Sequence, residues 1–127
     1  MAEYQAPLRD MSFVLNEVFQ APTLWNQLPE LAENVDPDTA NAVLEEAGKI
    51  NAEVIAPLNR SGDEEGCHWD NGVVRTPQGF IDAYRNYADG GWVGVGGDPQ
   101  YGGMGMPKMI TAQLEEMVNS ANLSFGL

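Results

Sequence analysis

Apolar residues recur at three- and four-residue spacing in five segments of the chain, and no segment alternates convincingly with a period of two. The strongest pattern covers residues 37–59, where Asp36 is a suitable N-cap and Pro37 suits the first helical position. Its apolar stripe comprises Ala40, Val43, Leu44, Ala47, Ile50, Val54 and Leu58. Pro57 either kinks the last turn of this predicted helix or ends it near Ala56.

Two weaker helical patterns precede this segment. The first covers residues 10–20, with Asp10 as its N-cap. The second covers residues 23–31, where Pro29 interrupts a short apolar stripe. These patterns predict two short helices ahead of the long one.

Two further patterns follow in the second half of the chain. Thr76 and Pro77 repeat the combination of a cap and a proline, and the pair Gly90-Gly91 ends the helix that they begin. We expect the apolar face of this helix to contain Phe80, Ile81, Tyr84 and Tyr87. The last predicted helix begins at Pro107 and directs Ile110, Leu114, Met117 and Ala121 inward.

The segments between these helices are polar or rich in glycine. Residues 60–78 contain many turn-forming residues, and Asp70-Asn71-Gly72 favours a turn before a short extended piece at Val73-Val74. Residues 91–107 are dense in glycine and proline. The whole pattern predicts an all-α fold, a helical bundle half-domain with long glycine-rich loops.

The composition is that of one acidic globular domain. The chain has 127 residues, 43% of them hydrophobic, which suffices for a sizeable core. Acidic residues outnumber basic ones 19 to 6, and the net charge of -13 argues against nucleic acid or an anionic membrane as a partner. No apolar run approaches the ~18 residues of a membrane span, and the N-terminus lacks the features of a secretory signal. We therefore expect a cytoplasmic protein.

Two short motifs suggest chemistry, and neither meets the requirements. Gly94-Val95-Gly96-Gly97 resembles part of a dinucleotide fingerprint, but Pro99 stands where the third glycine is needed. Cys67-His68 is the only pair of soft metal ligands, and a structural zinc site needs four ligands. Further oxygen ligands are present nearby in Asp63, Glu64 and Glu65. A solvated acidic turn is nevertheless the favoured interpretation.

Glu115 and Glu116 form a carboxylate pair in the last predicted helix. Adjacent residues point about 100° apart on a helix, so the two cannot act as a face-to-face acid and base. We expect both to be solvated. Trp92 and Tyr101 flank the glycine-rich loop and are expected to anchor it to the core, which gives that loop a structural role.

The order of motifs in the second half of the chain resembles a known family. Gly90-Gly91-Trp92 is followed by Asp-Pro-Gln-Tyr-Gly-Gly-Met-Gly at residues 98–105 and then by a helix with Glu115-Glu116-Met117. This order resembles the N-terminal helical domain of acyl-CoA dehydrogenases, which carry a similar Pro-x-x-Tyr-Gly-Gly-x-Gly loop. Residues 4–18 resemble a short extension at the front of one large bacterial subgroup of that family.

The resemblance implies an organisation and an activity. Residues 1–34 would be the N-terminal extension, and residues 35–127 would be the N-terminal helical domain, incomplete at its C-terminal end. The full-length family fold adds a β-barrel domain and a second helical domain. In the family, a glutamate base removes the α-proton of an acyl-CoA thioester while FAD accepts a hydride. The chain would be an N-terminal fragment of such an FAD-dependent oxidoreductase, inactive alone.

The resemblance also implies which residues act where. No catalytic, cofactor-binding or metal-binding residue is assigned to this chain, and neither Glu115 nor Glu116 takes the role of the catalytic base. The residues that would line part of the acyl pocket and bind substrate are Leu123, Ser124, Phe125, Gly126 and Leu127. For Phe125 and Leu127, packing against another domain is an alternative. The partners implied for the full-length enzyme are acyl-CoA, electron-transfer flavoprotein and further copies of itself in a homo-oligomer.

Two other functions stay open from the sequence alone. A non-enzymatic acidic helical interaction module would agree with the net charge of -13 and with the lack of a self-contained site. A small metalloprotein would use Cys67, His68 and the neighbouring acidic turn. Of these two, the interaction module is the main alternative.

Overall fold

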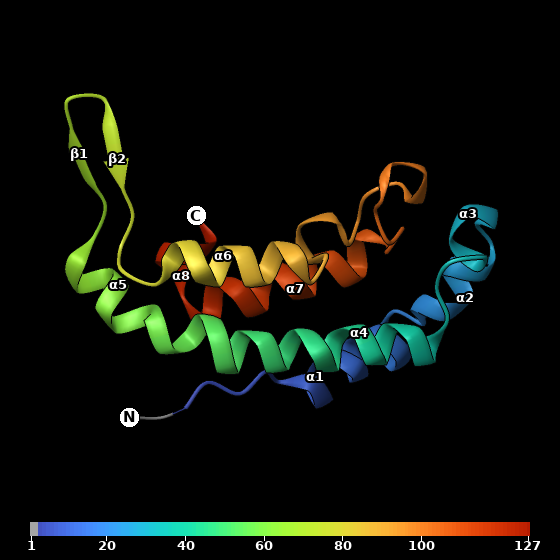
Figure 1. Cartoon of the computed structure of the whole chain (residues 1–127). Coiled ribbons are helices and arrows are strands. Elements are labelled where there is room, and N and C mark those ends of the chain that lie inside the picture. The colour runs from blue at the N-terminus through green and yellow to red at the C-terminus, as the bar shows by residue number, and fades with distance from the viewer. Residues whose placement is uncertain (1–2) are drawn as a thin grey trace.

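The computed structural model describes residues 3–127 and is built mainly of helices. Two helices form its centre, α4 (Pro37–Ile50) and α7 (Lys108–Ala121), which pack against each other. Figure 1 shows α1 (Leu8–Phe13) on one side of α4, with α6 (Phe80–Asp89) and α7 on the other. Besides helices, the described residues contain one two-stranded sheet. The predicted all-α fold is therefore confirmed.

The helical course of α4 continues through Pro57. A π-turn (η2, Asn51–Ile55) and a 3-10 turn (η3, Ala56–Leu58) connect α4 to α5 (Asn59–Glu65). Proline has no N–H to donate within a helix, and the wide and narrow turns accommodate it without ending the helical course. The prediction of a turn-rich segment from residue 60 was therefore wrong for α5.

Asp36 caps the N-terminus of α4, as predicted. Its Oδ1 accepts a hydrogen bond from the Thr39 N–H at 2.7 Å, and Pro37 follows at the first helical position. The hydrogen bonds from Thr39 hold the pKa of the Asp36 carboxyl below its usual value. The ionised cap therefore stabilises the folded state.

This cap makes stability depend on pH. A carboxyl whose pKa is lowered by folding stabilises the fold above its unfolded pKa, and the contribution is lost as pH falls through the folded pKa. We expect Asp36→Ala to melt at a lower temperature than the wild type at neutral pH. The difference in melting temperature between Asp36→Ala and the wild type should disappear as the pH falls below about 4. Thermal melts across pH check this, with Asp36→Asn, which retains a capping side chain, as the control.

The residues before α4 form short helical elements around its N-terminal half. These are α1, a π-turn (η1, Val14–Val18), α2 (Ala21–Asn26) and α3 (Pro29–Ala32). Helix α1 begins before Asp10, which lies in its first turn and is not the predicted cap. Pro29 begins a separate helix because proline suits the first helical position. The predicted break at Pro29 is thus the start of α3.

One apolar cluster forms the core and joins α1, α2, α4, α7 and part of the glycine-rich segment. Its buried members are Met11, Leu15, Ala21, Trp25, Val35, Ala40, Val43, Leu44, Ala47, Val95, Met106, Ile110, Leu114 and Met117. A smaller cluster consists of Ile55, Val118 and Ala121. The stripes predicted for the two central helices are confirmed at Ala40, Val43, Leu44, Ala47, Ile110, Leu114, Met117 and Ala121.

A β-hairpin projects from the helices (Figure 1). Strands β1 (His68–Asp70) and β2 (Val73–Arg75) pair antiparallel through a turn at Asn71 and Gly72. Both turn residues have positive φ, 47° and 82°. A two-residue hairpin loop of type I′ requires positive φ at both of its residues. The predicted turn and extended piece are confirmed, but the pairing with β1 was missed. Both strands are exposed throughout, so no alternation of apolar and polar residues marked them.

Helix α6 begins at Phe80 and not at the predicted Thr76-Pro77 start. Phe80 is buried and Tyr87 is half-buried, as predicted. Ile81 and Tyr84 are 58% and 55% exposed, so their assignment to the inner face was wrong. Ile81 follows Phe80 directly, and a rotation of about 100° turns it out of the face that Phe80 buries.

Candidate functional site

The glycine-rich segment, residues 90–107, is held together by its own backbone. The N–H groups of Met104 and Met106 donate to the carbonyl oxygens of Gly94 and Val95 at 3.1 and 3.0 Å, so two runs of the segment lie side by side. Gly105 N–H donates to the Gly97 carbonyl at 2.9 Å. This segment is a compact element that forms one side of a pocket.

The segment is anchored to the core at several points. Val95 and Met106 are buried in the main cluster, and Trp92 is partly buried against it, as predicted. Tyr101 was also predicted to be an anchor, and that prediction was wrong, because Tyr101 is 84% exposed. It ends a 3-10 turn (η5, Pro99–Tyr101) that lies away from the core.

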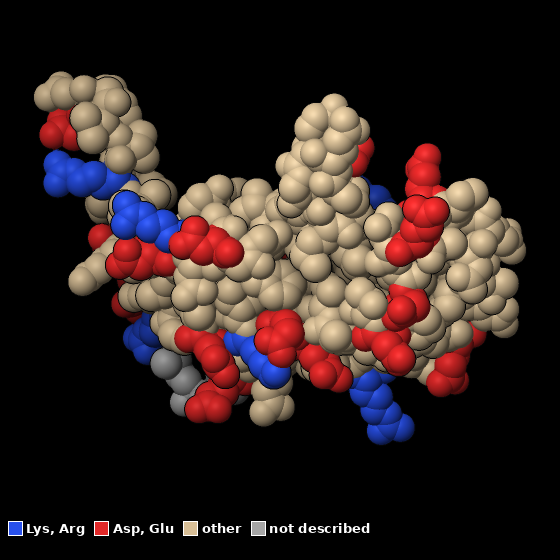
Figure 2. Space-filling model, turned by 45° about the vertical axis from the view of Figure 1, so that its right-hand side comes forward, with Lys and Arg blue, Asp and Glu red and all other residues tan. Residues whose placement is uncertain are grey.

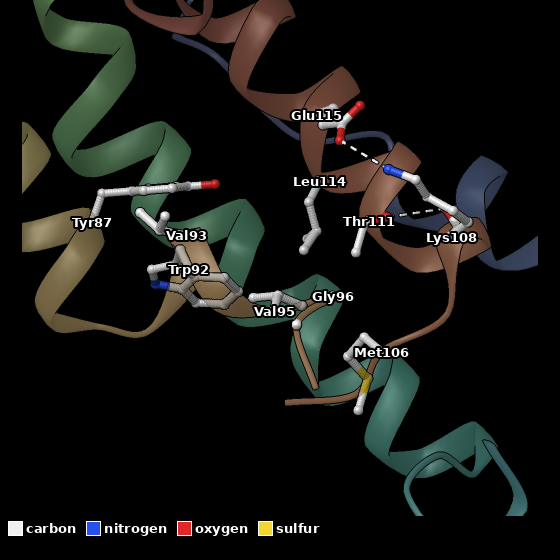
Figure 3. Close-up of a pocket in the computed structure, with 11 residues that line it drawn as sticks. Tyr87, Trp92, Val93, Val95, Gly96, Met106, Lys108, Thr111, Leu114 and Glu115 are labelled. Atoms are coloured by element: carbon white, nitrogen blue, oxygen red, sulfur yellow. Dashed lines mark hydrogen bonds and ion pairs between the residues drawn. The ribbon is translucent and has the colours of Figure 1, made fainter. Parts of the chain in front are cut away.

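A pocket of about 520 Å³ lies between this segment, the end of α6 and the first half of α7. Figure 3 shows the rings of Tyr87 and Trp92 on one side and Leu114 on the other. Its further lining residues are Val93, Val95, Gly96, Gly97, Met106, Lys108, Thr111 and Glu115. The pocket therefore has mostly apolar walls with a few polar groups, which suits an apolar ligand or side chain.

Glu115 and Lys108 form an exposed ion pair at 3.8 Å beside this pocket. Glu116, the next residue, is exposed as well. The prediction that both glutamates are solvated is confirmed. An exposed ion pair contributes little to stability.

Tyr87 forms one wall of the pocket. Burial raises the pKa of its phenol, and the charge of Glu115 raises it further. The neutral phenol is favoured in the fold, so its contribution to stability is complete below about pH 10 and is lost as the pH rises through the folded pKa.

We expect Glu115→Gln to lower the pKa of Tyr87, measured by ultraviolet titration of tyrosinate. Glu116→Gln is the matched control and should leave it unchanged.

The five residues predicted to bind substrate form α8 (Leu123–Gly126) and Leu127. Phe125 is half-buried, and the other four are exposed. The Phe125 ring packs edge-on against Phe80, with ring centroids 5.5 Å apart. Helix α8 thus has an exposed surface, and its Phe125 side chain packs against α6.

None of these five residues lines the pocket beside α7, but a row of aromatic rings joins the two places. The rings of Phe125 and Tyr87 are 6.4 Å apart, and those of Tyr87 and Trp92 are also 6.4 Å apart. The predicted residues and the pocket are therefore two ends of one aromatic row.

Cys67 and His68 are exposed at the start of the hairpin. Within residues 3–127, no group of three or more His, Cys, Asp or Glu side chains is placed to hold a metal ion. The helices of this part of the chain are each too short or too polar to cross a membrane.

Two residues near the site were not given their roles by the sequence analysis. Tyr87 was assigned to an apolar face, and its place in a pocket wall depends on the glycine-rich segment folding beside it. Asn122 is the N-cap of α8, where its side chain accepts from Phe125 N–H at 3.1 Å. The signal for this cap was present, because asparagine is among the preferred capping residues.

The fold and the site define a class of protein. It is an all-α domain in which a glycine-rich segment, held by backbone hydrogen bonds within itself, lies beside two central helices. No family model matches the chain. The chain is 42% identical over 126 residues to 3-methylmercaptopropionyl-CoA dehydrogenase of Ruegeria pomeroyi, a match that covers 98% of this chain and 21% of the relative. It is 31% identical over 124 residues to the broad-specificity linear acyl-CoA dehydrogenase FadE5 of Mycobacterium tuberculosis, with 96% and 20% covered.

Acyl-CoA dehydrogenases are therefore homologues of this chain over nearly its whole length. The resemblance seen in the sequence motifs is confirmed. The chain spans about a fifth of the length of the curated relatives that it matches.

Proposed function

We propose that this chain supplies the N-terminal helical domain of an FAD-dependent acyl-CoA dehydrogenase and is inactive alone. The observation that carries the proposal is the similarity to two acyl-CoA dehydrogenases over at least 96% of this chain. We place an N-terminal extension at residues 1–34 and the domain at residues 35–127. Met11, Leu15 and Trp25 of the extension lie in the same core as α4 and α7, so the extension folds with the domain.

The chain's own residues do not fit a complete flavin site. A pyrophosphate is commonly held by free backbone N–H groups at a glycine-rich turn. Here the N–H groups of Gly94, Gly97 and Gly103 are bonded within the segment. Figure 2 shows the lysines and arginines of one face scattered among acidic side chains, apart from two that lie close together near the base of the hairpin. We therefore propose that FAD, which would accept the hydride, is held by parts of the enzyme outside these residues.

We propose that α8 and Leu127 form part of the acyl pocket wall. Leu123 and Leu127 are 56% and 95% exposed, and the partly buried Phe125 adds an aromatic ring to the same short helix. An apolar acyl chain gains about 25 cal/mol for each Å² of apolar surface removed from water. Exposed leucines beside an aromatic ring are suited to that contact. Packing against another domain is the alternative for Phe125 and Leu127.

The outer face of α6 supports a place within a larger enzyme. Ile81 and Tyr84 lie three residues apart on one face and are more than half exposed, as is Val93 in the next turn. Soluble monomers seldom expose large groups of apolar side chains without a partner. In the full-length enzyme we expect acyl-CoA and electron-transfer flavoprotein as partners, and a homo-oligomeric assembly. The catalytic glutamate would lie outside this chain.

A chimeric enzyme tests the proposal. The segment of the Ruegeria pomeroyi relative that matches residues of this chain is replaced by this chain, and the product is purified. We expect it to hold flavin and to oxidise an acyl-CoA with an artificial electron acceptor. The isolated chain should show neither flavin absorbance nor activity. A folded chimera without activity, or stoichiometric flavin binding by the isolated chain, would contradict the proposal.

A non-enzymatic acidic interaction module is the second candidate. The observation that favours it is the net charge of -13 together with the lack of a self-contained catalytic site in residues 3–127. The DNA sequence after the codon for Leu127 separates the two candidates. A stop codon there favours the module, whereas several hundred further codons favour the enzyme.

A further inference from the structure

Asn122 stands between α7 and α8, and its side chain is fully buried. Its Oδ1 accepts from the Phe125 N–H at 3.1 Å and from the Ser124 hydroxyl at 2.9 Å. Its Nδ2 donates to the carbonyl oxygen of Ile55 at 3.2 Å, across 67 residues of sequence. One side chain therefore ties the short helix α8 to a distant part of the fold.

The irregular helix around Pro57 leaves the carbonyl of Ile55 without its usual α-helical donor. In a regular α-helix, the N–H of Asn59 would donate to the Ile55 oxygen. Here it donates to the Ala56 oxygen instead, within the 3-10 turn. Ile55 is fully buried, and a hydrogen bond to a buried carbonyl stabilises the folded state. The Asn122 side chain donates such a bond to the Ile55 carbonyl from a distant part of the chain.

The three contacts demand a particular side chain at position 122. Two of them need an acceptor oxygen, and the third needs an N–H or O–H donor on the other side of the same group. An amide of the length of asparagine provides both. Ionised aspartate keeps the acceptors and loses the donor, whereas serine keeps one capping oxygen and is too short to span both sides.

Few other side chains hold helix α8 in place. It is four residues long, which is too short for a helix to be stable by itself. Leu123 and Leu127 are exposed, so Phe125 makes the main apolar side-chain contacts of α8. It packs against Phe80, Tyr87 and the smaller core cluster. Apart from the packing of its backbone against α5 and α7, the orientation of α8 thus depends on Phe125 and on the Asn122 hydrogen bonds.

We propose that Asn122 is a positioning residue that fixes where α8 and Phe125 lie. This inference rests on the proposed function of α8 as part of the acyl pocket wall. Asn122 itself touches no substrate in this scheme, since its side chain is fully buried. Its hydrogen bonds hold the wall in one place, and so set how well the wall fits an acyl chain.

The first test uses the isolated chain and does not depend on any enzymatic activity. In Asn122→Asp at neutral pH, the Phe125 ring resonances should shift and the nuclear Overhauser contacts between Phe125 and Phe80 should weaken. Protonation of the new carboxyl restores a donor, so acidification should reverse these changes.

A matched control and a second variant keep this test decisive. Asn51 is 1% exposed and makes one hydrogen bond, to the Ala47 carbonyl of its own helix. Asn51→Asp introduces the same buried charge and should leave the Phe125 signals unchanged. If Asn122→Asp does not fold, Asn122→Ser, which adds no charge, should weaken the Phe125 contacts while α7 stays folded. Wild-type Phe125 signals in either folded variant would overturn the proposal.

The second test places the same variants in the chimeric enzyme. We expect Asn122→Ser to raise the KM for acyl-CoA about tenfold and to change kcat little, because the wall contacts the substrate and not the reacting atoms. An unchanged KM in an active chimera would overturn the role in substrate binding. A chimera that is inactive with asparagine at position 122 would instead contradict the proposed function, and the resonance test would still decide the positioning role.

Discussion

Replacing Gly103 by alanine should lower the free energy of unfolding by roughly 3 kcal/mol. A Cβ atom at this position would overlap the carbonyl of Gly97 and would lie 2.6 Å from the Gly97 Cα. Both obstacles are backbone atoms, so no side chain can rotate away to relieve the clash. The backbone around Gly97 cannot easily move away from Gly103, because the neighbouring Val95 is buried. Its carbonyl also accepts a hydrogen bond from the N–H of the buried Met106.

Gly94→Ala is the matched control for this prediction. It lies in the same segment, and a Cβ there would meet its nearest atom, the Gly103 Cα, at an ordinary 3.8 Å. Urea unfolding of the two variants should therefore show a large loss of stability for Gly103→Ala and a small one for Gly94→Ala. Equal midpoints would show that the close approach of the two glycine runs is not part of the folded structure.

The central helices were predictable because the local sequence features that favour a helix agree with the packing of that helix in the core. The Asp36 cap, Pro37 and the apolar stripe that follows all favour one helix, and the stripe is the one that the core buries. Helix α5 was missed because its sequence is polar and follows Pro57, so nothing local distinguished a helix from a loop. The pairing of β1 with β2 was missed because neither strand buries a face.

The candidate site was less predictable than the fold. Leu123 to Leu127 were identified through the family resemblance and not through any pattern in those residues. The aromatic row depends on Tyr87, Trp92 and Phe125, which come from three elements that only the tertiary fold brings together. The bond from Asn122 to Ile55 joins residues that are 67 positions apart in the sequence. A sequence pattern records periodicity within one element, and it does not record such long-range pairs.

Leu44→Ala should cost about 3 kcal/mol of stability, a large share of the ~5–15 kcal/mol that a folded domain possesses. Leu44 is 2% exposed in the core cluster that joins α4 and α7. Truncation would remove buried methyl groups and leave a cavity between helices that are held by their neighbours. Denaturant unfolding followed by circular dichroism measures the change in the midpoint.

Leu123→Ala makes the same chemical change at a leucine that is 56% exposed, and it should cost less than about 1 kcal/mol. The comparison of the two variants decides whether the isolated chain forms its hydrophobic core without other domains. A cooperative transition that Leu44→Ala shifts and Leu123→Ala does not would show that α4 and α7 fold together without further domains. Equal effects, or no cooperative transition in the wild type, would show that the core is completed by chain outside these residues. The first outcome is the one expected, because the core cluster draws its members from both halves of the chain and buries them almost completely.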